Sequence, residues 1–272
     1  MSDSQYQNLP RPAGGLQHQY GPRVHILSEP YPMSMLTRLC AEPTVQPQIN
    51  DLVCALYDWL LAEVSSRFLT TKPVEVPTRM ARLHPAEAVY RGECIDRAQQ
   101  VVVVDIARAG ILPSHRMYHG LHQIIDADGL RQDHIVSSRA TNAEHQVVGV
   151  QMDASKIGGP VAGATVLIPD PMAATGSSLS AVIRRYHGLQ GGPPRRVVAV
   201  HLIVTPEYLM RVTQEFPELD VVAIRLDRGL SPGHVLETEP GARWSDEVGL
   251  NGTQYIVPGA GGVGEVMNNA WV

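Results

Sequence analysis

Hydrophobic residues first form a regular pattern at residues 49–68, where they recur at helical spacing. The recurring positions are Leu52, Val53, Leu56, Leu60 and Val64. This spacing places them on one face of an α-helix. The pattern therefore predicts an amphipathic helix, and a segment punctuated by prolines follows it.

Four later runs are short, apolar and rich in β-branched residues. The runs are Val101–Ile106, Thr165–Ile168, Val197–Val204 and Val221–Ile224. Nearly continuous runs of this kind are typical of strands that are buried on both faces of a parallel sheet. We therefore predict four such strands.

Helical patterns separate these runs. One has an apolar stripe, formed by Leu179, Val182, Ile183 and Tyr186. Another is expected to begin with Thr205 as its N-cap and Pro206 at its first position. The alternation of strand and helix predicts an α/β fold with a doubly wound sheet. Because ligands bind such sheets at the carboxyl ends of the strands, the loops after the strands are the candidate sites.

Two segments depart from this alternation. Residues 1–22 are rich in Gln, Pro, Gly and Tyr, and we expect a flexible extension or an arm that orders against a partner subunit. Residues 229–250 are polar and rich in Pro and Gly, and they predict an inserted loop before a strand-like segment, Thr253–Val257. We expect one domain over residues 23–272.

Composition narrows the class of protein. With 272 residues, of which 44% are hydrophobic, the chain can bury a full core. A net charge of −5 gives no basic field for nucleic acid. Cys40, Cys54 and Cys94 indicate neither a disulfide framework nor a zinc site. No apolar run is long enough to span a membrane and no signal peptide is evident, so we expect a cytoplasmic protein with no membrane partner.

The loop after the run Thr165–Ile168 carries the strongest chemical signal. Its residues are Asp170, Pro171, Met172, Ala173, Ala174, Thr175, Gly176, Ser177 and Ser178. Small residues let the backbone wrap closely around a ligand, and the amides, the three hydroxyls and the following helix N-terminus favour a phosphate dianion. Asp170 can accept hydrogen bonds from a sugar diol. The alternative is a tight strand-to-helix turn in which Thr or Ser only caps the helix.

This loop resembles the phosphoribosyl pyrophosphate (PRPP) loop of uracil phosphoribosyltransferases. Other segments resemble the same family in the same order. These segments are His25–Leu39, Ala107–Gly110, Ser138–Arg139, Ser155–Ile157 and Gly249–Gly259. The resemblance implies a type I phosphoribosyltransferase fold, which is a mostly parallel twisted sheet flanked by helices, with a flap and a C-terminal hood.

The resemblance also implies a reaction. Enzymes of this family transfer ribose 5-phosphate from PRPP to N1 of uracil, giving UMP and pyrophosphate, with Mg²⁺ bound to PRPP. Catalysis of this kind depends mainly on positioning and electrostatics. A nucleotide effector and a homodimer or homotetramer are further features that the resemblance implies.

The family's binding roles fall on matching positions of this chain. The resemblance assigns the phosphate and ribose to residues 170–178. It assigns the pyrophosphate to Arg108, Ala109, Gly110 and Arg139. For either arginine the alternative is a surface ion pair. The base falls to residues 251–265, in particular to Tyr255, Ile256, Gly261, Gly262 and Val263. The alternative there is a terminal strand with a glycine-rich tail.

Three departures from the family pattern bear on activity. Gly262 stands where the family has an aspartate that contacts PRPP or its magnesium, and Glu265 replaces a second aspartate. Asp105 precedes the pyrophosphate turn, where its carboxylate can bind magnesium or can only cap a turn. The insertion at residues 229–250, together with a lengthened flap, fits either an altered acceptor pocket or a decaying active site.

Two further motifs are weaker. Gly259, Gly261 and Gly264 match a dinucleotide-binding fingerprint, but only residues 265–272 follow, too few for the helix and second strand it requires. His115, His119 and His122 share one helical face, which indicates either a metal site or, more simply, a surface or interface face. Three functions therefore remain open. They are uracil phosphoribosyl transfer, transfer to another base or heterocycle, and a non-catalytic PRPP- or nucleotide-binding regulatory role.

Overall fold

The computed structural model describes residues 14–141 and 147–271, with the backbone alone for 137–141 and 147–153. Its main sheet runs in the order β1-β10-β9-β7-β4-β5-β6, and β8 pairs with β9. Every pairing in this sheet is parallel except β5 with β6. The strands are β1 (Val24–Ile26), β4 (Val101–Ala107), β5 (Leu130–Thr141), β6 (Val147–Lys156), β7 (Thr165–Pro169), β8 (Met172–Ala173), β9 (Arg196–Val204) and β10 (Asp220–Leu226).

The four apolar runs form the centre of this sheet, as predicted. They correspond to β4, β7, β9 and β10, which are buried along almost their whole length. Burial on both faces explains why β-branched residues follow one another without polar alternation. The strand assignments from sequence are therefore confirmed.

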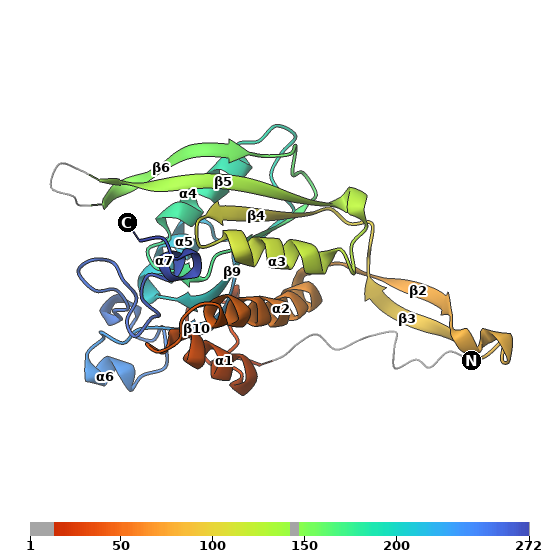
Figure 1. The fold of residues 1–272 in the computed structure, drawn as a ribbon, viewed down its shortest axis with the longest axis horizontal. Helices are drawn as coiled ribbons and strands as arrows, with labels where there is room; N and C mark the ends of the chain where they lie inside the picture. Colours follow the sequence, from red (N-terminus) through yellow and green to blue (C-terminus); the bar gives the residue numbers. More distant parts are fainter. Residues whose placement is uncertain (1–13, 142–146, 272) are drawn as a thin grey trace.

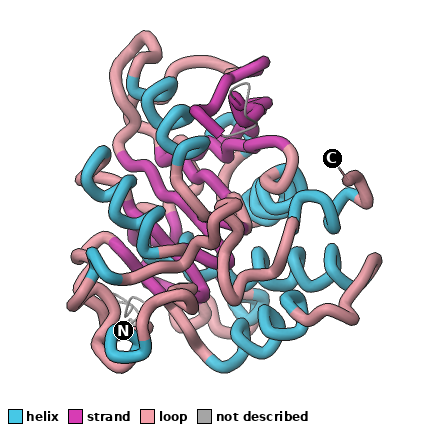
Figure 2. Tube along the Cα trace, turned by 90° about the vertical axis from the view of Figure 1, so that its left-hand side faces the viewer, coloured by secondary structure: helices cyan, strands magenta, loops and turns pink. Residues whose placement is uncertain are grey.

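Helices cover both faces of the sheet, and Figure 2 shows them on either side of the strands. One hydrophobic core includes side chains of α1 (Pro30–Cys40), α2 (Gln48–Phe68), α3 (Ile111–Leu121) and α7 (Val263–Asn268). The core on the other face includes side chains of α4 (Ser177–His187) and α5 (Pro206–Glu215). The predicted amphipathic helix is α2, whose five predicted apolar positions are all buried. Thr205 caps α5 by accepting a hydrogen bond from the amide of Tyr208, as predicted.

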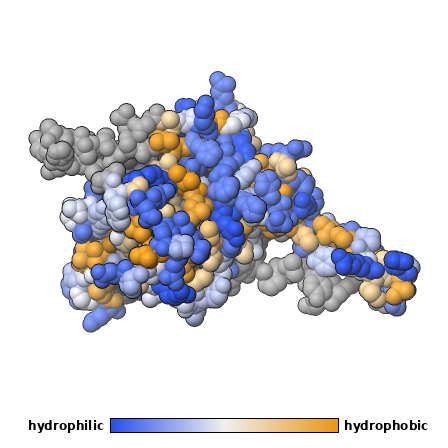
Figure 3. Space-filling model, viewed as in Figure 1, coloured by the Kyte–Doolittle hydropathy of each residue, from blue (hydrophilic) through white to orange (hydrophobic). Residues whose placement is uncertain are grey.

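Two antiparallel hairpins project from the body in Figure 1. One pairs β5 with β6, where the resemblance implied a flap. The other, β2 (Thr71–Pro77) with β3 (Val89–Ile95), lies in the segment that the sequence marked only by its prolines. Prolines are tolerated here because a two-stranded ribbon consists of edge strands. This hairpin bears apolar surface in Figure 3, and Val76, Met80 and Leu83 in this region are exposed.

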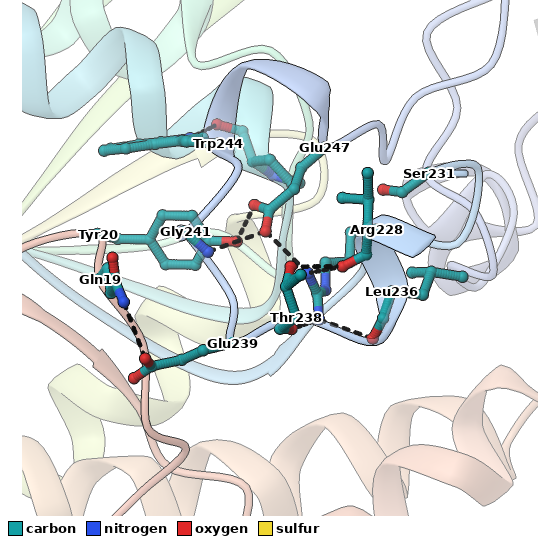
Figure 4. Close-up of polar contacts among 12 residues, drawn as sticks. Gln19, Tyr20, Arg228, Ser231, Leu236, Thr238, Glu239, Gly241, Trp244 and Glu247 are labelled. Carbon is teal, nitrogen blue, oxygen red and sulfur yellow. Dashed lines mark hydrogen bonds and ion pairs between the residues drawn. The ribbon is translucent and has the colours of Figure 1, made fainter. Parts of the chain in front are cut away.

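The predicted extension and insertion need correction. Residues 14–22 are not a free extension: Tyr20 is 3% exposed and its ring packs against Trp244 of the insertion (Figure 4). The insertion is not an irregular loop throughout, because it contains α6 (Gly233–Leu236) and a 3-10 turn, Trp244–Asp246. Residues 1–13 lie outside the described chain. The two segments pack against each other, and local sequence patterns do not reveal this contact.

The strand-like segment Thr253–Val257 is not a strand. It makes one isolated bridge, between Leu250 and Ile256. The side chain of Asn251 accepts hydrogen bonds from the amides of Thr253 and Tyr255 at 3.0 and 2.9 Å, and Gln254 has a φ of 64°. These contacts form a turn, so the amides are not available to a neighbouring strand. Among the described residues, no helix is long and apolar enough to cross a membrane.

Candidate active site at the carboxyl ends of the strands

The predicted phosphate loop is fixed by the strand beside it and the helix after it. The amide of Asp170 donates to the carbonyl of Val200 at 3.0 Å, and β8 pairs with the end of β9. Gly176 has a φ of 79° and is the N-cap of α4. Only glycine adopts this conformation readily, so the residue type is dictated by the turn. The loop therefore lies at the carboxyl ends of β7 and β9, as the fold requires of a ligand site.

The hydroxyls of this loop gather at the N-terminus of α4. Thr175 Oγ1 and Ser177 Oγ are 3.1 Å apart, and the amide of Ser177 lies 3.4 Å from Thr175 Oγ1. Arg211 on α5 donates to Ser177 Oγ. A cation, two hydroxyls and a helix N-terminus are together suited to an anion. Arg211 was not predicted as a site residue, although the sequence shows both its positive charge and its place on the helix that Thr205 caps.

Asp170 is partly buried at the start of the loop. Its Oδ1 accepts from the amide of Met172 at 3.3 Å. Burial raises its pKa to about 6, and the nearby charge of Asp105 adds to this. The carboxyl therefore titrates close to neutral pH.

His201 on β9 fixes the start of this loop through a hydrogen bond to the backbone of Asp170. Burial lowers its pKa to about 4, so the ring is neutral. Its Nδ1 lies 2.6 Å from the carbonyl of Asp170, which can only accept, so Nδ1 carries the proton. Its Nε2 then accepts from the hydroxyl of Tyr208 at 2.6 Å. This buried chain ties the loop to α5, and a histidine within an apolar strand was the available sequence signal.

The predicted pyrophosphate turn follows β4 and leads into α3. The peptide bond between Ala107 and Arg108 is cis. A Cβ at Gly110 would meet the carbonyl of Pro169 at 3.1 Å, so this turn touches the start of the phosphate loop. Arg108 donates to the carbonyl of Ala270 at 3.1 Å, which brings the C-terminal segment to the same place. Arg139 lies in β5 opposite Val150, and its side chain is outside the described part of the chain.

Asp105 lies within β4 opposite His134 of β5. Its Oδ2 is 2.9 Å from His134 Nδ1, while its Oδ1 is buried with no hydrogen-bond partner. Burial raises the pKa of this carboxyl. The alternative that Asp105 caps a turn is wrong, because its hydrogen bond goes to a side chain on the neighbouring strand.

A metal ion fits beside Asp105 only if a bound substrate and water supply its other ligands. Over residues 14–141 and 147–271, no three His, Cys, Asp or Glu side chains are grouped to hold a metal. The unpartnered Oδ1 of Asp105 is an oxygen of the type that Mg²⁺ prefers, and Mg²⁺ usually takes its other ligands from water and substrate phosphates. His115 and His119 on α3 and His122 at its C-cap are exposed, which supports their interpretation as a surface face.

The predicted base-binding segment is held by buried polar contacts. Asp227 at the end of β10 accepts from the amide of Gly259 at 2.8 Å and from Arg225 at 2.6 and 2.8 Å. Ile256 is 7% exposed and packs in the core, whereas Tyr255 is 45% exposed. Gly261 has a φ of 67°, and Val263 begins α7 with its side chain buried. Arg225 and Asp227, which precede the insertion, were not predicted as site residues.

Because Gly262 has no side chain, the carboxylate of Glu265 can lie beside its Cα. A Cβ at position 262 would collide with Oε2 of Glu265. The Oε1 of the same Glu265 lies 3.8 Å from the guanidinium of Arg108. The carboxylate of Glu265 therefore lies against the place where a side chain at 262 would stand, and it faces the pyrophosphate turn.

Comparison with known proteins agrees with this geometry. A family model described as uracil phosphoribosyltransferase matches residues 26–241. The uracil phosphoribosyltransferase of Thermococcus sibiricus is 26% identical, over 87% of this chain and 85% of that protein. The one of Pyrococcus furiosus is 25% identical, also over 87% and 85%. The structure of the AQ2163 protein from Aquifex aeolicus has the same fold, with a TM-score of 0.68 and 22% identity over 92% of this chain and 99% of that one.

The family match spans both the phosphate loop and the pyrophosphate turn. Phosphoribosyl transfer to a pyrimidine or purine base is the activity that the family and the fold support, and the family implies PRPP and a base as substrates. This chain belongs to the uracil phosphoribosyltransferase family, with the type I phosphoribosyltransferase fold, and is a phosphoribosyltransferase.

Proposed function

We propose that this enzyme transfers the ribose 5-phosphate of PRPP to N1 of uracil and releases UMP and pyrophosphate. The convergence of three segments carries the proposal. The phosphate loop meets the pyrophosphate turn at Pro169 and Gly110, and the predicted base-binding segment meets that turn where Glu265 lies 3.8 Å from the guanidinium of Arg108. A donor and an acceptor bound to these segments would therefore share one site.

The donor's 5-phosphate is held by the loop at residues 170–178. The amides and hydroxyls at the start of α4 donate to its oxygens, and Arg211 adds a positive charge. The ionised carboxylate of Asp170 accepts from the ribose hydroxyls. His201 keeps the backbone of Asp170 in place, so the loop is organised before the substrate arrives.

In the reaction, the bond between ribose C1 and the pyrophosphate oxygen breaks and the bond between C1 and N1 of uracil forms. The proton on N1 passes to solvent water, and pyrophosphate departs with the electron pair of the broken bond. Arg108 and the amides of Ala109 and Gly110 bind the negative oxygens of this leaving group, and the family resemblance assigns the same role to Arg139. Mg²⁺ bound with PRPP would neutralise further charge, and Asp105 would be its protein ligand.

The acceptor is recognised through the backbone of the C-terminal segment. Uracil is a small planar base with alternating donors and acceptors, which suits amides and carbonyls near Ile256, Gly261 and Gly262. Tyr255 precedes Ile256 in the sequence, and Val263 follows Gly262. A different base is the second candidate, because the ordered insertion bonds to this segment: Val257 donates to the carbonyl of Gly249 at 2.9 Å.

The test is an assay with PRPP, Mg²⁺ and a panel of pyrimidine and purine bases, with nucleotide and pyrophosphate both measured. Uracil should give UMP at an enzymatic rate, and Asp170→Asn and Arg108→Ala should each reduce it strongly. If a nucleotide forms from another base and not from uracil, that base is the acceptor. PRPP binding without any nucleotide would leave a non-catalytic role and overturn the proposal.

A further inference from the structure

The N-terminal arm, residues 14–22, is built onto the insertion, residues 229–250. Gln19 donates from its backbone amide to the carbonyl of Pro240 at 2.8 Å and from its side chain to Glu239 at 2.9 Å. The ring of Tyr20 packs edge-on against Trp244, with centroids 4.9 Å apart. Figure 4 shows Gln19 bonded to Glu239 and Tyr20 beside Trp244, in segments that are more than two hundred residues apart in sequence.

A buried ion pair holds the insertion together where the arm meets it. Glu247 has a side chain that is 0% exposed, and it accepts from Arg228 and from the amide of Gly241, both at 2.8 Å. The hydroxyl of Tyr20 donates to the other oxygen of this carboxylate. Burial raises the pKa of the Tyr20 phenol, so the hydroxyl keeps the proton that it donates.

The guanidinium of Arg228 makes further hydrogen bonds within the insertion. Besides Glu247 it donates to the carbonyls of Val235, Leu236 and Thr238, at distances of 3.1, 3.2 and 2.8 Å. A buried charge pair is stable only when such additional hydrogen bonds are made, and loss of one partner leaves the other uncompensated. The insertion is therefore a unit organised around one ion pair, and Tyr20 completes it.

Both ends of this unit bond to the predicted base-binding segment. At its start, the amide of Gly229 donates to the carbonyl of Val257 at 3.0 Å, and Asp227, next to Arg228, accepts from the amide of Gly259. At its end, the carbonyl of Gly249 accepts from the amide of Val257. The position of the segment therefore depends on contacts that the insertion supplies.

We propose that the arm and the insertion form a brace that positions the acceptor-binding segment, with Tyr20 and Glu247 as its positioning residues. This rests on the proposed function for the role of residues 251–265. The brace touches the acceptor end of the site, whereas the phosphate loop is held by His201 and β9. Loosening it therefore weakens acceptor binding and leaves donor binding unchanged.

The test compares Tyr20→Phe with Tyr31→Phe in the full chain. The first change removes the hydroxyl that donates to Glu247 and keeps the ring that packs on Trp244. The second makes the same chemical change at a tyrosine on α1 that is 66% exposed. Amide hydrogen exchange is followed by mass spectrometry, and the KM for acceptor and for PRPP is measured for each protein.

Exchange at the amides of Val257 and Gly259 should be about tenfold faster in Tyr20→Phe, because the lost hydrogen bond goes to a charged buried group. The acceptor KM should rise severalfold while the PRPP KM stays constant. Tyr31→Phe should match the wild type in every measurement.

Two results would overturn the brace. One is faster exchange within residues 229–247 with unchanged exchange at Val257 and Gly259. The other is an equal rise in both KM values. If the wild type forms no nucleotide from any base, the proposed function fails, and the exchange experiment still decides whether the brace holds the segment.

Discussion

Asp170 shows how a single residue of this site works against the stability of the fold. Its pKa is raised to about 6 by burial, from an ordinary value of 3.8. A carboxyl with a higher pKa folded than unfolded binds more protons in the folded state. Stability therefore falls as pH rises between these two values and stays lower above them. An ionised Asp170 at neutral pH is suited to binding ribose and not to folding.

We therefore predict that Asp170→Asn is more stable than the wild type and inactive. The gain in the free energy of unfolding should be on the order of 2 kcal/mol at about pH 8 and smaller at about pH 5. Urea unfolding at both pH values measures it. An equal gain at the two pH values would show that the carboxyl is not ionising within this range.

Glu265 is a second residue with a measurable effect, because its carboxylate faces Arg108. In the absence of a divalent cation, the Glu265 carboxylate repels a pyrophosphate anion and competes with that anion for the guanidinium of Arg108. The pair is partly exposed, so its effect is at most about 1 kcal/mol. We predict that Glu265→Gln binds inorganic pyrophosphate about threefold more tightly in the presence of a chelator. Calorimetric titration measures this, and weaker binding by the variant would show that Glu265 helps to hold the anion.

At the scale of elements, β9 supports the phosphate loop through His201. We predict that His201→Phe lowers stability by about 1–3 kcal/mol, because the Tyr208 hydroxyl and the Asp170 carbonyl lose their buried partner. The PRPP KM should rise and the acceptor KM should not. Tyr208→Phe keeps the hydrogen bond to Asp170 and serves as the control. A larger effect of Tyr208→Phe on PRPP would contradict this support.

The strands and helices of the core could be predicted because their signals are local. β-branched runs such as Val101–Ile106 specify buried strands, and Thr205 with Pro206 specifies a helix start. The β2–β3 hairpin was missed because Pro73 and Pro77 argue against a strand unless both edges are known to be free. Thr253–Val257 was wrongly assigned because the side chain of Asn251 takes the amides that a strand partner would use.

At the scale of the whole molecule, the sequence predicted which segments form the site, and the structure shows where these segments meet. The loop at residues 170–178 was predicted from its residue types and from the family resemblance, and the turn at Arg108 was predicted from the resemblance. The contacts of Tyr20 with Glu247 and of Arg108 with Ala270 join residues more than a hundred and fifty positions apart, and no local pattern encodes them. Such pairings depend on the complete fold, which is also why the ordered insertion resembled a loop in the sequence.

The most direct measurement is a single-turnover reaction in which enzyme exceeds labelled PRPP, with Mg²⁺ and uracil present. We predict that UMP and pyrophosphate form together in equal amounts, and that Arg108→Ala slows both to the same extent. Pyrophosphate released without UMP, or no turnover of PRPP with uracil, would contradict the assignment of one shared site for donor and acceptor.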